Sequence, residues 1–399
     1  MKGRSSLPSE PSALLIVGLL IVCGYGGGRL VGLLRLPAVT GYIIVGLALG
    51  ISGAAIVGDA WWHSLEWTVE FALSLVAFNV GYELRFAELA RLGKGLTLLV
   101  VLETMGAFIA IWLVMLLVGL GWRLGMLIGA IGAATAPAVT VIVFNSLRAK
   151  GPLTQAVLAC VGFDDALGLV IYSVVAPLLA AHGTANGVLA LKVLYQLGLS
   201  IGVGSCLGAL AVIVTRYIKH EAELMVAIVG IVVFCAGLLE SHPFGLHCSP
   251  LLGAMMVGFL VGNFGRAPRR FGETFFAGAS PFYTLYFALA GSRLRLFALV
   301  ALWLPALGYL GARLGGKWLG AYIGGKLGRL PSVVTRLTGP CLFSQAGIAI
   351  GLTVYAAKDF PQWAPTVVAV MLGTTVVTEI VGPALTRFAV KKAGEARAA

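Results

Sequence analysis

The chain has 399 residues, of which 59% are hydrophobic and only 11% are charged. Soluble domains carry about 25% charged residues, so this composition excludes a large globular protein and indicates a membrane protein with many spans. The net charge of +12 would suggest nucleic-acid binding in a soluble protein, but here most basic residues lie in short connections between apolar segments. We therefore expect the lipid bilayer as a partner and no nucleic acid.

Apolar runs long enough to cross a bilayer recur along the whole chain. A helix needs about 20 residues to span roughly 30 Å of hydrocarbon. We predict thirteen such helices, at residues 12–34, 37–57, 66–82, 95–120, 125–145, 154–181, 187–215, 222–240, 248–264, 275–292, 296–325, 333–357 and 363–387. The sequence thus predicts an all-α polytopic membrane protein.

The basic residues are distributed unequally between the two sides of the membrane. Counting alternate connections puts nineteen lysines and arginines on one side and six on the other. The positive-inside rule then places the C-terminus in the cytoplasm and, with an odd number of spans, the N-terminus outside an inner (cell) membrane. Lys2 and Arg4 before an apolar run also resemble a secretory signal, but the charge asymmetry needs thirteen spans, so we expect a retained first helix.

Two predicted spans, the fifth and the twelfth, are interrupted by proline. Pro137 lies within Ala134–Ala138, and Pro340 lies within Thr338–Gly347. Proline removes a backbone donor and exposes carbonyls and half-helix ends. If spans one to six and eight to thirteen form inverted repeats, these are equivalent members, which is typical of a transporter site. A simple proline kink is the alternative for either residue alone.

Two adjacent aspartates, Asp164 and Asp165, lie in the middle of the apolar sixth span. A carboxylate at the bilayer centre costs about 2.5–3.5 kcal/mol on insertion scales, so a pair indicates cation or proton handling. On a helix the two side chains point about 100° apart, which predicts different roles. Desolvation and repulsion between like charges favour a proton on one of them, so that a proton and a cation compete. The alternative is a structural acid paired with a basic neighbour.

Further charged residues fall inside predicted spans. Lys317 is the expected partner of an aspartate and could release its proton when a cation arrives, although it could instead reach towards the membrane surface. Glu103 is expected to form a structural ion pair with Arg313 or Arg293. We expect no cofactor and no metal other than a transported monovalent cation.

Several segments together resemble those of a known family, the Nap/Kef-type monovalent cation:proton antiporters. In chain order they are Ala134–Ala138, Arg148–Thr154, Phe163–Gly168, Gly316–Gly324 and Phe343–Gly351. The paired aspartates with a later lysine are the specific part of this resemblance, which spans most of the chain. It implies an inverted-repeat fold with two crossed broken helices, and a homodimer in which a six-helix core moves against a dimerising scaffold.

The resemblance also implies roles for individual residues. Asp165 would be the main ion-binding carboxylate and proton acceptor, whereas Asp164 would form a salt bridge with Lys317 in the ion-free state. Thr135 would lie at the helix crossing close to the ion. The remaining residues expected to line the site on the broken helices are Pro137, Pro340, Ser344 and Gln345.

The expected division of the chain follows the same resemblance. Residues 1–93 would hold scaffold and dimerisation helices one to three, and residues 94–182 core helices four to six. Residues 183–295 would hold a linker helix and scaffold helices up to the tenth. Residues 296–390 would complete the core, and residues 391–399 would form a short cytoplasmic tail.

The expected function is an electrogenic sodium (or lithium)/proton antiporter, not an enzyme, with a proton and the cation competing for Asp165. It would work by alternating access and serve pH homeostasis. No motif distinguishes sodium from potassium, so a potassium/proton antiporter is an alternative. A sodium-coupled organic-anion symporter is another, since broken-helix ends can bind carboxylates. An intramembrane aspartyl protease is the least favoured reading, because its two acids must face one another and share a proton.

Overall fold

The computed structural model describes residues 12–33, 36–180, 187–241, 248–266, 271–345 and 347–396. The sixteen helices of this described part are α1 (Ala13–Leu33), α2 (Ala38–Leu49), α3 (Asp59–Glu83), α4 (Phe86–Leu117), α5 (Trp122–Gly132), α6 (Pro137–Ser146), α7 (Pro152–Ala180), α8 (Gly187–Tyr217), α9 (Glu221–Glu240), α10 (Pro250–Phe264), α11 (Phe271–Ser292), α12 (Leu296–Ala301), α13 (Trp303–Leu327), α14 (Ser332–Cys341), α15 (Ile348–Asp359) and α16 (Ala364–Lys392). Lys2, Arg4 and the end of the predicted tail, 397–399, lie outside the described residues.

The predicted all-α membrane architecture is confirmed. Within the described ranges, six helices are long and apolar enough to cross a membrane: α1, α4, α7, α8, α9 and α16. Shorter apolar helices include α2, α5 and α10. The predicted fifth span consists of α5 and α6, and the predicted twelfth consists of α14 and α15. Both broken spans therefore occur where the prolines predicted them.

The two breaks use proline differently. Pro137 is the first residue of α6, a position at which a backbone N–H would have no partner within the helix, so its absence costs nothing. Residues 133–136 link α5 to α6. Pro340 instead lies in the last turn of α14, and the chain leaves the helix directly afterwards. Gly347 then adopts φ +59°, a left-handed conformation that favours glycine, immediately before α15 begins.

Glycines bring α4 and α13 into close contact. A Cβ atom on Gly316 would lie 2.6 Å from the carbonyl oxygen of Gly106. A Cβ atom on Gly320 would lie 2.3 Å from the carbonyl oxygen of Leu102. Small residues let helix backbones approach in lipid, where no hydrophobic effect drives helix association. This contact places the turn of α4 that carries Glu103 directly against the turn of α13 that follows Lys317.

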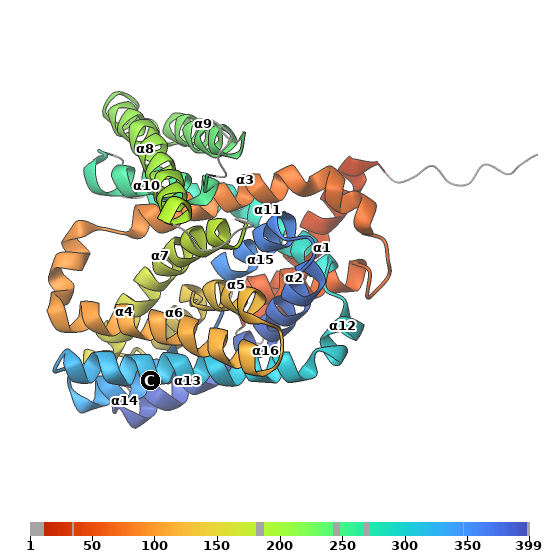
Figure 1. Ribbon diagram of the computed structural model, residues 1–399. Helices are drawn as coiled ribbons and strands as arrows, with labels where there is room; N and C mark the ends of the chain where they lie inside the picture. The colour runs from red at the N-terminus through yellow and green to blue at the C-terminus, as the bar shows by residue number, and fades with distance from the viewer. Residues whose placement is uncertain are drawn as a thin grey trace, which may run out of the picture.

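The helices pack in two groups (Figure 1). Helices α4 to α7 pack with α13 to α16, while α3, α8 and α9 pack around α10, and α1 and α2 pack with α11. Figure 1 shows α4, α13 and α14 along one side of the molecule and α8, α9 and α10 on the opposite side. The division into core and scaffold helices stays a prediction, as does movement between them.

Two boundaries differ from the predicted spans. The predicted eleventh span, 296–325, is divided into the short α12 and the longer α13, which begins at Trp303. Helix α4 begins at Phe86 and bends at Gly93, whose φ of +67° interrupts the helix before its apolar part. Neither change moves the charged residues, since Lys317 and Glu103 remain well inside α13 and α4.

Candidate functional site

The two aspartates lie at the middle of α7. Asp164 and Asp165 are the thirteenth and fourteenth of its 29 residues. Their exposed fractions are 0% and 8%. Because neighbouring residues of a helix point in different directions, the two carboxyl groups meet different surroundings.

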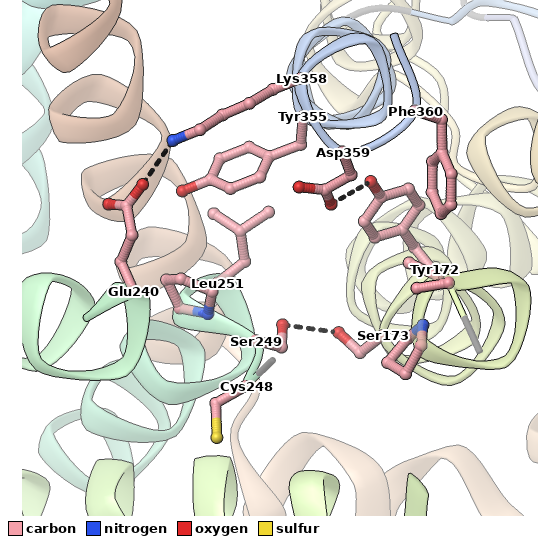
Figure 2. A pocket seen from close by; sticks show the side chains of 14 residues that line it. Tyr172, Ser173, Glu240, Cys248, Ser249, Leu251, Tyr355, Lys358, Asp359 and Phe360 are labelled. Carbon is pink, nitrogen blue, oxygen red and sulfur yellow. Dashed lines mark hydrogen bonds and ion pairs between the residues drawn. The ribbon is translucent and has the colours of Figure 1, made fainter. Parts of the chain in front are cut away.

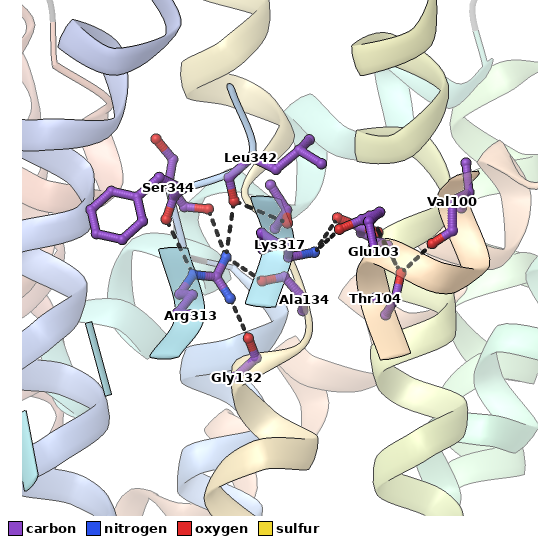
Figure 3. Close-up of polar contacts among 12 residues, drawn as sticks. Val100, Glu103, Thr104, Gly132, Ala134, Arg313, Lys317, Leu342 and Ser344 are labelled. Atoms are coloured by element: carbon purple, nitrogen blue, oxygen red, sulfur yellow. Dashed lines mark hydrogen bonds and ion pairs between the residues drawn. The ribbon is translucent and has the colours of Figure 1, made fainter. Parts of the chain in front are cut away.

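Asp164 belongs to a buried cluster centred on Lys317 (Figure 3). The Nζ atom of Lys317 lies 2.7 Å from Oδ2 of Asp164 and 2.8 Å from Oε2 of Glu103. Thr104 donates a hydrogen bond from Oγ1 to Oδ1 of Asp164 at 2.8 Å. All four side chains are fully buried, so the lysine charge is balanced by carboxylates without help from water. The cluster joins α13, α7 and α4.

The partner of Glu103 differs from our expectation. We expected Arg313 or Arg293, but the structure pairs Glu103 with Lys317. The reason is the glycine contact between α4 and α13: a Cβ atom on Gly320 would lie 2.6 Å from the Cα atom of Glu103. Lys317 precedes Gly320 by three residues and therefore shares its face of the helix.

Arg313 binds the backbone of both broken helices. Its Nη2 atom donates to the carbonyl oxygens of Ala134 at 2.7 Å and Ser344 at 3.1 Å, and Nε donates to that of Phe343 at 3.2 Å. The carbonyl oxygens of Gly132 and Leu342 accept further hydrogen bonds. Figure 3 shows these carbonyl groups converging on the guanidinium group.

This role of Arg313 follows from the chemistry of helix ends. The last carbonyl groups of α5 and α14 lack helical partners and carry partial negative charge. A guanidinium group supplies five donors in a planar fork and stays charged, so one arginine can serve both ends. Sequence reasoning missed this role because it treated Arg313 only as a partner for a carboxylate.

The two non-helical links touch where the broken helices cross. The backbone N–H of Ala136 donates to the carbonyl oxygen of Ser344 at 3.0 Å. Thr135 donates from Oγ1 to the carbonyl oxygen of Leu342 at 3.5 Å, and Thr140 to that of Cys341 at 3.3 Å. The structure thus brings the link that carries Thr135 against the link that carries Ser344, and Pro137 follows directly as the first residue of α6.

The other predicted residues on the second broken helix occupy different positions. The side chain of Gln345 accepts a hydrogen bond from Tyr309, a buried residue of α13 that sequence reasoning did not identify. Pro340 lies inside the last turn of α14. Arg293 lies in the turn after α11, where its backbone N–H donates a hydrogen bond to the carbonyl oxygen of Ala290. The ion-pair partner of Glu103 is Lys317 instead.

Asp165 contrasts with its neighbour in its hydrogen bonding. Its Oδ1 atom is buried and has no hydrogen-bond partner among the residues that the structure describes. A buried carboxylate oxygen without a donor is costly unless the group binds a proton or a cation. Asp165 is therefore buried, lies next to the charged cluster of Lys317, and has a carboxylate oxygen atom that can accept a proton or a cation.

A cavity of about 350 Å³ lies further along α7 (Figure 2). Tyr172 and Ser173 line it, and Tyr172 donates a hydrogen bond to Asp359 of α15 at 3.4 Å. Leu251 of α10 lines both this cavity and a small apolar space beside Leu169. Since Leu169 follows Asp165 by one helical turn and precedes Ser173 by another, apolar side chains separate the aspartate from the cavity.

Comparison with known sequences identifies relatives over nearly the whole chain. A profile of a family described as "Sodium/hydrogen exchanger, transmembrane" matches residues 17–392. The ammonium/H(+) antiporter subunit AmhT of Alkalihalophilus pseudofirmus is 24% identical over 334 residues, covering 79% of this chain and 80% of AmhT. The glutathione-regulated potassium-efflux system protein KefC of Klebsiella pneumoniae is 27% identical over 238 residues, covering 58% of this chain but only 37% of KefC.

Comparison with solved structures identifies the fold. The sodium proton antiporter MjNhaP1 from Methanocaldococcus jannaschii superposes with a TM-score of 0.80, at 18% sequence identity. The superposition covers 95% of this chain and 98% of MjNhaP1. The expected antiporter fold, with two broken helices that cross, is thereby confirmed.

Proposed function

Because the chain belongs to the sodium/hydrogen exchanger family and is a cation:proton antiporter rather than an enzyme, we propose that it exchanges Na⁺ or Li⁺ for protons electrogenically. The observation that carries this proposal is the buried, unpartnered Oδ1 atom of Asp165 beside the cluster of Lys317. A proton and the cation compete for this carboxyl group. Because only one of them binds at a time, the flows of the two ions are coupled.

Lys317 supplies the charge on which electrogenic exchange depends. In the cation-free site its single positive charge is shared between Asp164 and Glu103. A cation bound at Asp165 attracts the adjacent Asp164 carboxylate and weakens its contact with Lys317. Lys317 then releases one proton to the water of the open path, in addition to the proton that the cation displaced from Asp165. More protons than cations therefore cross the membrane in each cycle.

Alternating access needs a path to Asp165 from each side of the membrane in turn. The cavity beside Tyr172 is the path on the side where α7 and α15 end, and the charge asymmetry assigns this side to the exterior. The apolar layer at Leu169 and Leu251 closes this path in the present conformation. We propose a homodimer in the inner (cell) membrane, with the N-terminus outside and the C-terminus in the cytoplasm.

The identity of the transported cation has two specific alternatives. The names of AmhT and KefC refer to ammonium and to potassium efflux, so NH₄⁺ and K⁺ are alternative substrates of the same site. Family membership favours exchange over symport of an organic anion. It also argues against the aspartyl protease, as does the geometry, because Asp164 faces Lys317 and does not share a proton with Asp165.

The test measures exchange in proteoliposomes that enclose a pH-sensitive dye. We expect Na⁺ or Li⁺ to change the internal pH for the wild type and not for Asp165→Asn. The expected loss is at least about a hundredfold, which corresponds to about 2.7 kcal/mol of cation-binding free energy. K⁺ and NH₄⁺ are added in parallel to rank the cations. Thr375→Val is the matched control, because among the described residues this buried hydroxyl group bonds only the carbonyl oxygen of Met371 in its own helix, at 2.8 Å.

Two outcomes would contradict the proposal. Exchange that persists in Asp165→Asn would show that another group binds the cation. Exchange whose rate does not respond to an imposed membrane potential would show that Lys317 keeps its proton and that equal numbers of charges cross.

A further inference from the structure

Glu379 is a second buried carboxylate that the exchange mechanism above does not use. It lies on α16 with an exposed fraction of 0%, and neither of its carboxylate oxygens has a hydrogen-bond partner among the described residues. An ionised carboxylate in such a place is unstable unless a proton or a cation accompanies it. Asp164 and Glu103, in contrast, share Lys317.

The position of Glu379 in its helix matches that of the aspartates. Helices α7 and α16 each contain 29 residues and are the last spans of the two predicted repeats. Asp165 is the fourteenth residue of α7, and Glu379 is the sixteenth of α16. In an inverted repeat, such positions lie at similar membrane depth but are approached from opposite sides.

One face of α16 lies against the crossing of the broken helices. A Cβ atom on Gly382 would lie 1.9 Å from Oγ of Ser344, so the Ser344 side chain occupies the space beside this glycine. Thr386 donates a hydrogen bond to the carbonyl oxygen of Cys341 at 3.4 Å. Glu379 precedes these residues by three and seven positions and therefore shares their face of the helix.

Two hydroxyl groups, those of Thr40 and Ser344, lie beside this face of α16. The hydroxyl group of Thr40 on α2 is buried and lies near this carboxyl group. The Oγ atom of Ser344 is buried without a partner in the described part of the chain. Arg313 of α13 donates to the carbonyl oxygen of Ser344 at 3.1 Å, so a positive charge is held at the same crossing.

From this arrangement we propose that Glu379, with the hydroxyl groups of Thr40 and Ser344, forms a second binding site for a monovalent cation or a proton. The site lies on the face of α16 that packs against the crossing, with Thr40 contributed by α2. Carboxylate and hydroxyl oxygens suit a hard monovalent cation such as Na⁺ or Li⁺. The inference rests on the proposed exchange function, because the ion at Glu379 is the one exchanged at Asp165.

The experiment measures protons that the purified protein releases when a cation binds. Wild type in weakly buffered detergent solution receives NaCl, or choline chloride as the control, and a pH-sensitive dye reports the release. Asp165→Asn should release fewer protons than wild type but keep a Na⁺-dependent component. Adding Glu379→Gln to that variant should abolish the remainder, whereas Glu379→Asp should retain it. Thr375→Val, one turn away on α16, should behave as wild type.

The outcomes separate this inference from the proposed function. If wild type exchanges ions in proteoliposomes but Asp165→Asn releases no proton on addition of Na⁺, the second site is wrong and the exchange stands. The same conclusion follows if Glu379→Gln leaves the residual release unchanged. If wild type neither exchanges ions nor releases protons with any of Na⁺, Li⁺, K⁺ and NH₄⁺, both proposals are wrong.

Discussion

Two lysines in this protein each contact two carboxylates, in opposite surroundings. Lys317 contacts Asp164 and Glu103, and all three side chains have an exposed fraction of 0%. Lys358 at the end of α15 contacts Glu70 of α3 and Glu240 of α9, with exposed fractions of 37%, 21% and 30%. Figure 2 shows Lys358 and Glu240 of the second set at the margin of the cavity.

The difference lies in what replaces a lost contact. Water and salt solvate the charges around Lys358 when they separate, so such pairs contribute only about 0–1 kcal/mol. No solvent reaches the groups around Lys317, so losing one partner leaves a buried charge without compensation. One lysine and two carboxylates therefore form a fixed element of the site around Lys317. Around Lys358, the same combination of charges forms a weak, reversible contact between α15 and helices α3 and α9.

The largest effect is expected for Lys317→Met. This change leaves the carboxyl groups of Asp164 and Glu103 without a counter-charge in a site that water does not reach. Removing one partner of a buried ion pair lowers the free energy of unfolding by about 3–5 kcal/mol. We expect a large fall in the thermal unfolding midpoint of the purified protein. Lys317→Gln keeps a hydrogen-bond donor and serves as the control. Its unfolding midpoint should fall less than that of Lys317→Met. A midpoint for Lys317→Met as high as that of a Lys358 variant would contradict the comparison.

An intermediate effect is expected for Thr104→Val. Valine has nearly the same shape but cannot donate the hydrogen bond that Oγ1 makes to Asp164. Hydrogen bonds to charged groups contribute about 1.5–3 kcal/mol, so the unfolding midpoint should lie between those of the two lysine variants. Thr378→Val is the matched control, because the hydroxyl group of Thr378 bonds only the carbonyl oxygen of Thr375 in its own helix. Equal shifts in both variants would mean that the contact with Asp164 contributes nothing of its own.

The smallest effect is expected for Lys358→Gln. Exposed ion pairs contribute about 0–1 kcal/mol, and salt screens them over a Debye length of about 8–10 Å at ionic strengths of 0.1–0.15 M. The unfolding midpoint should therefore fall slightly in low salt and not at all in high salt. The measurement compares wild type and variant at both salt concentrations. A large fall that persists in high salt would show that Lys358 is as firmly held as Lys317.

Helix class and the break positions could be predicted because they depend on local sequence. Apolar length predicts spans, and proline favours a break, although Pro177, Pro281 and Pro383 lie inside helices that continue past them. The expected contact between Lys317 and Asp164 is present at 2.7 Å, although it was inferred through a family resemblance rather than from spacing. The partner of Glu103 was wrongly predicted, since it depends on how α4 and α13 rotate against each other at Gly320.

The sequence by itself determined that this is a helical membrane protein with an acidic pair at mid-membrane and two broken spans, because burial and backbone chemistry act residue by residue. Only the tertiary structure decided which groups meet. It placed Arg313 on carbonyl groups from two links about 200 residues apart, and it left Asp165 and Glu379 with buried oxygens that have no partner in the described residues. The physical reason is that hydrogen bonds and ion pairs require contact within about 3–4 Å, which only helix packing sets.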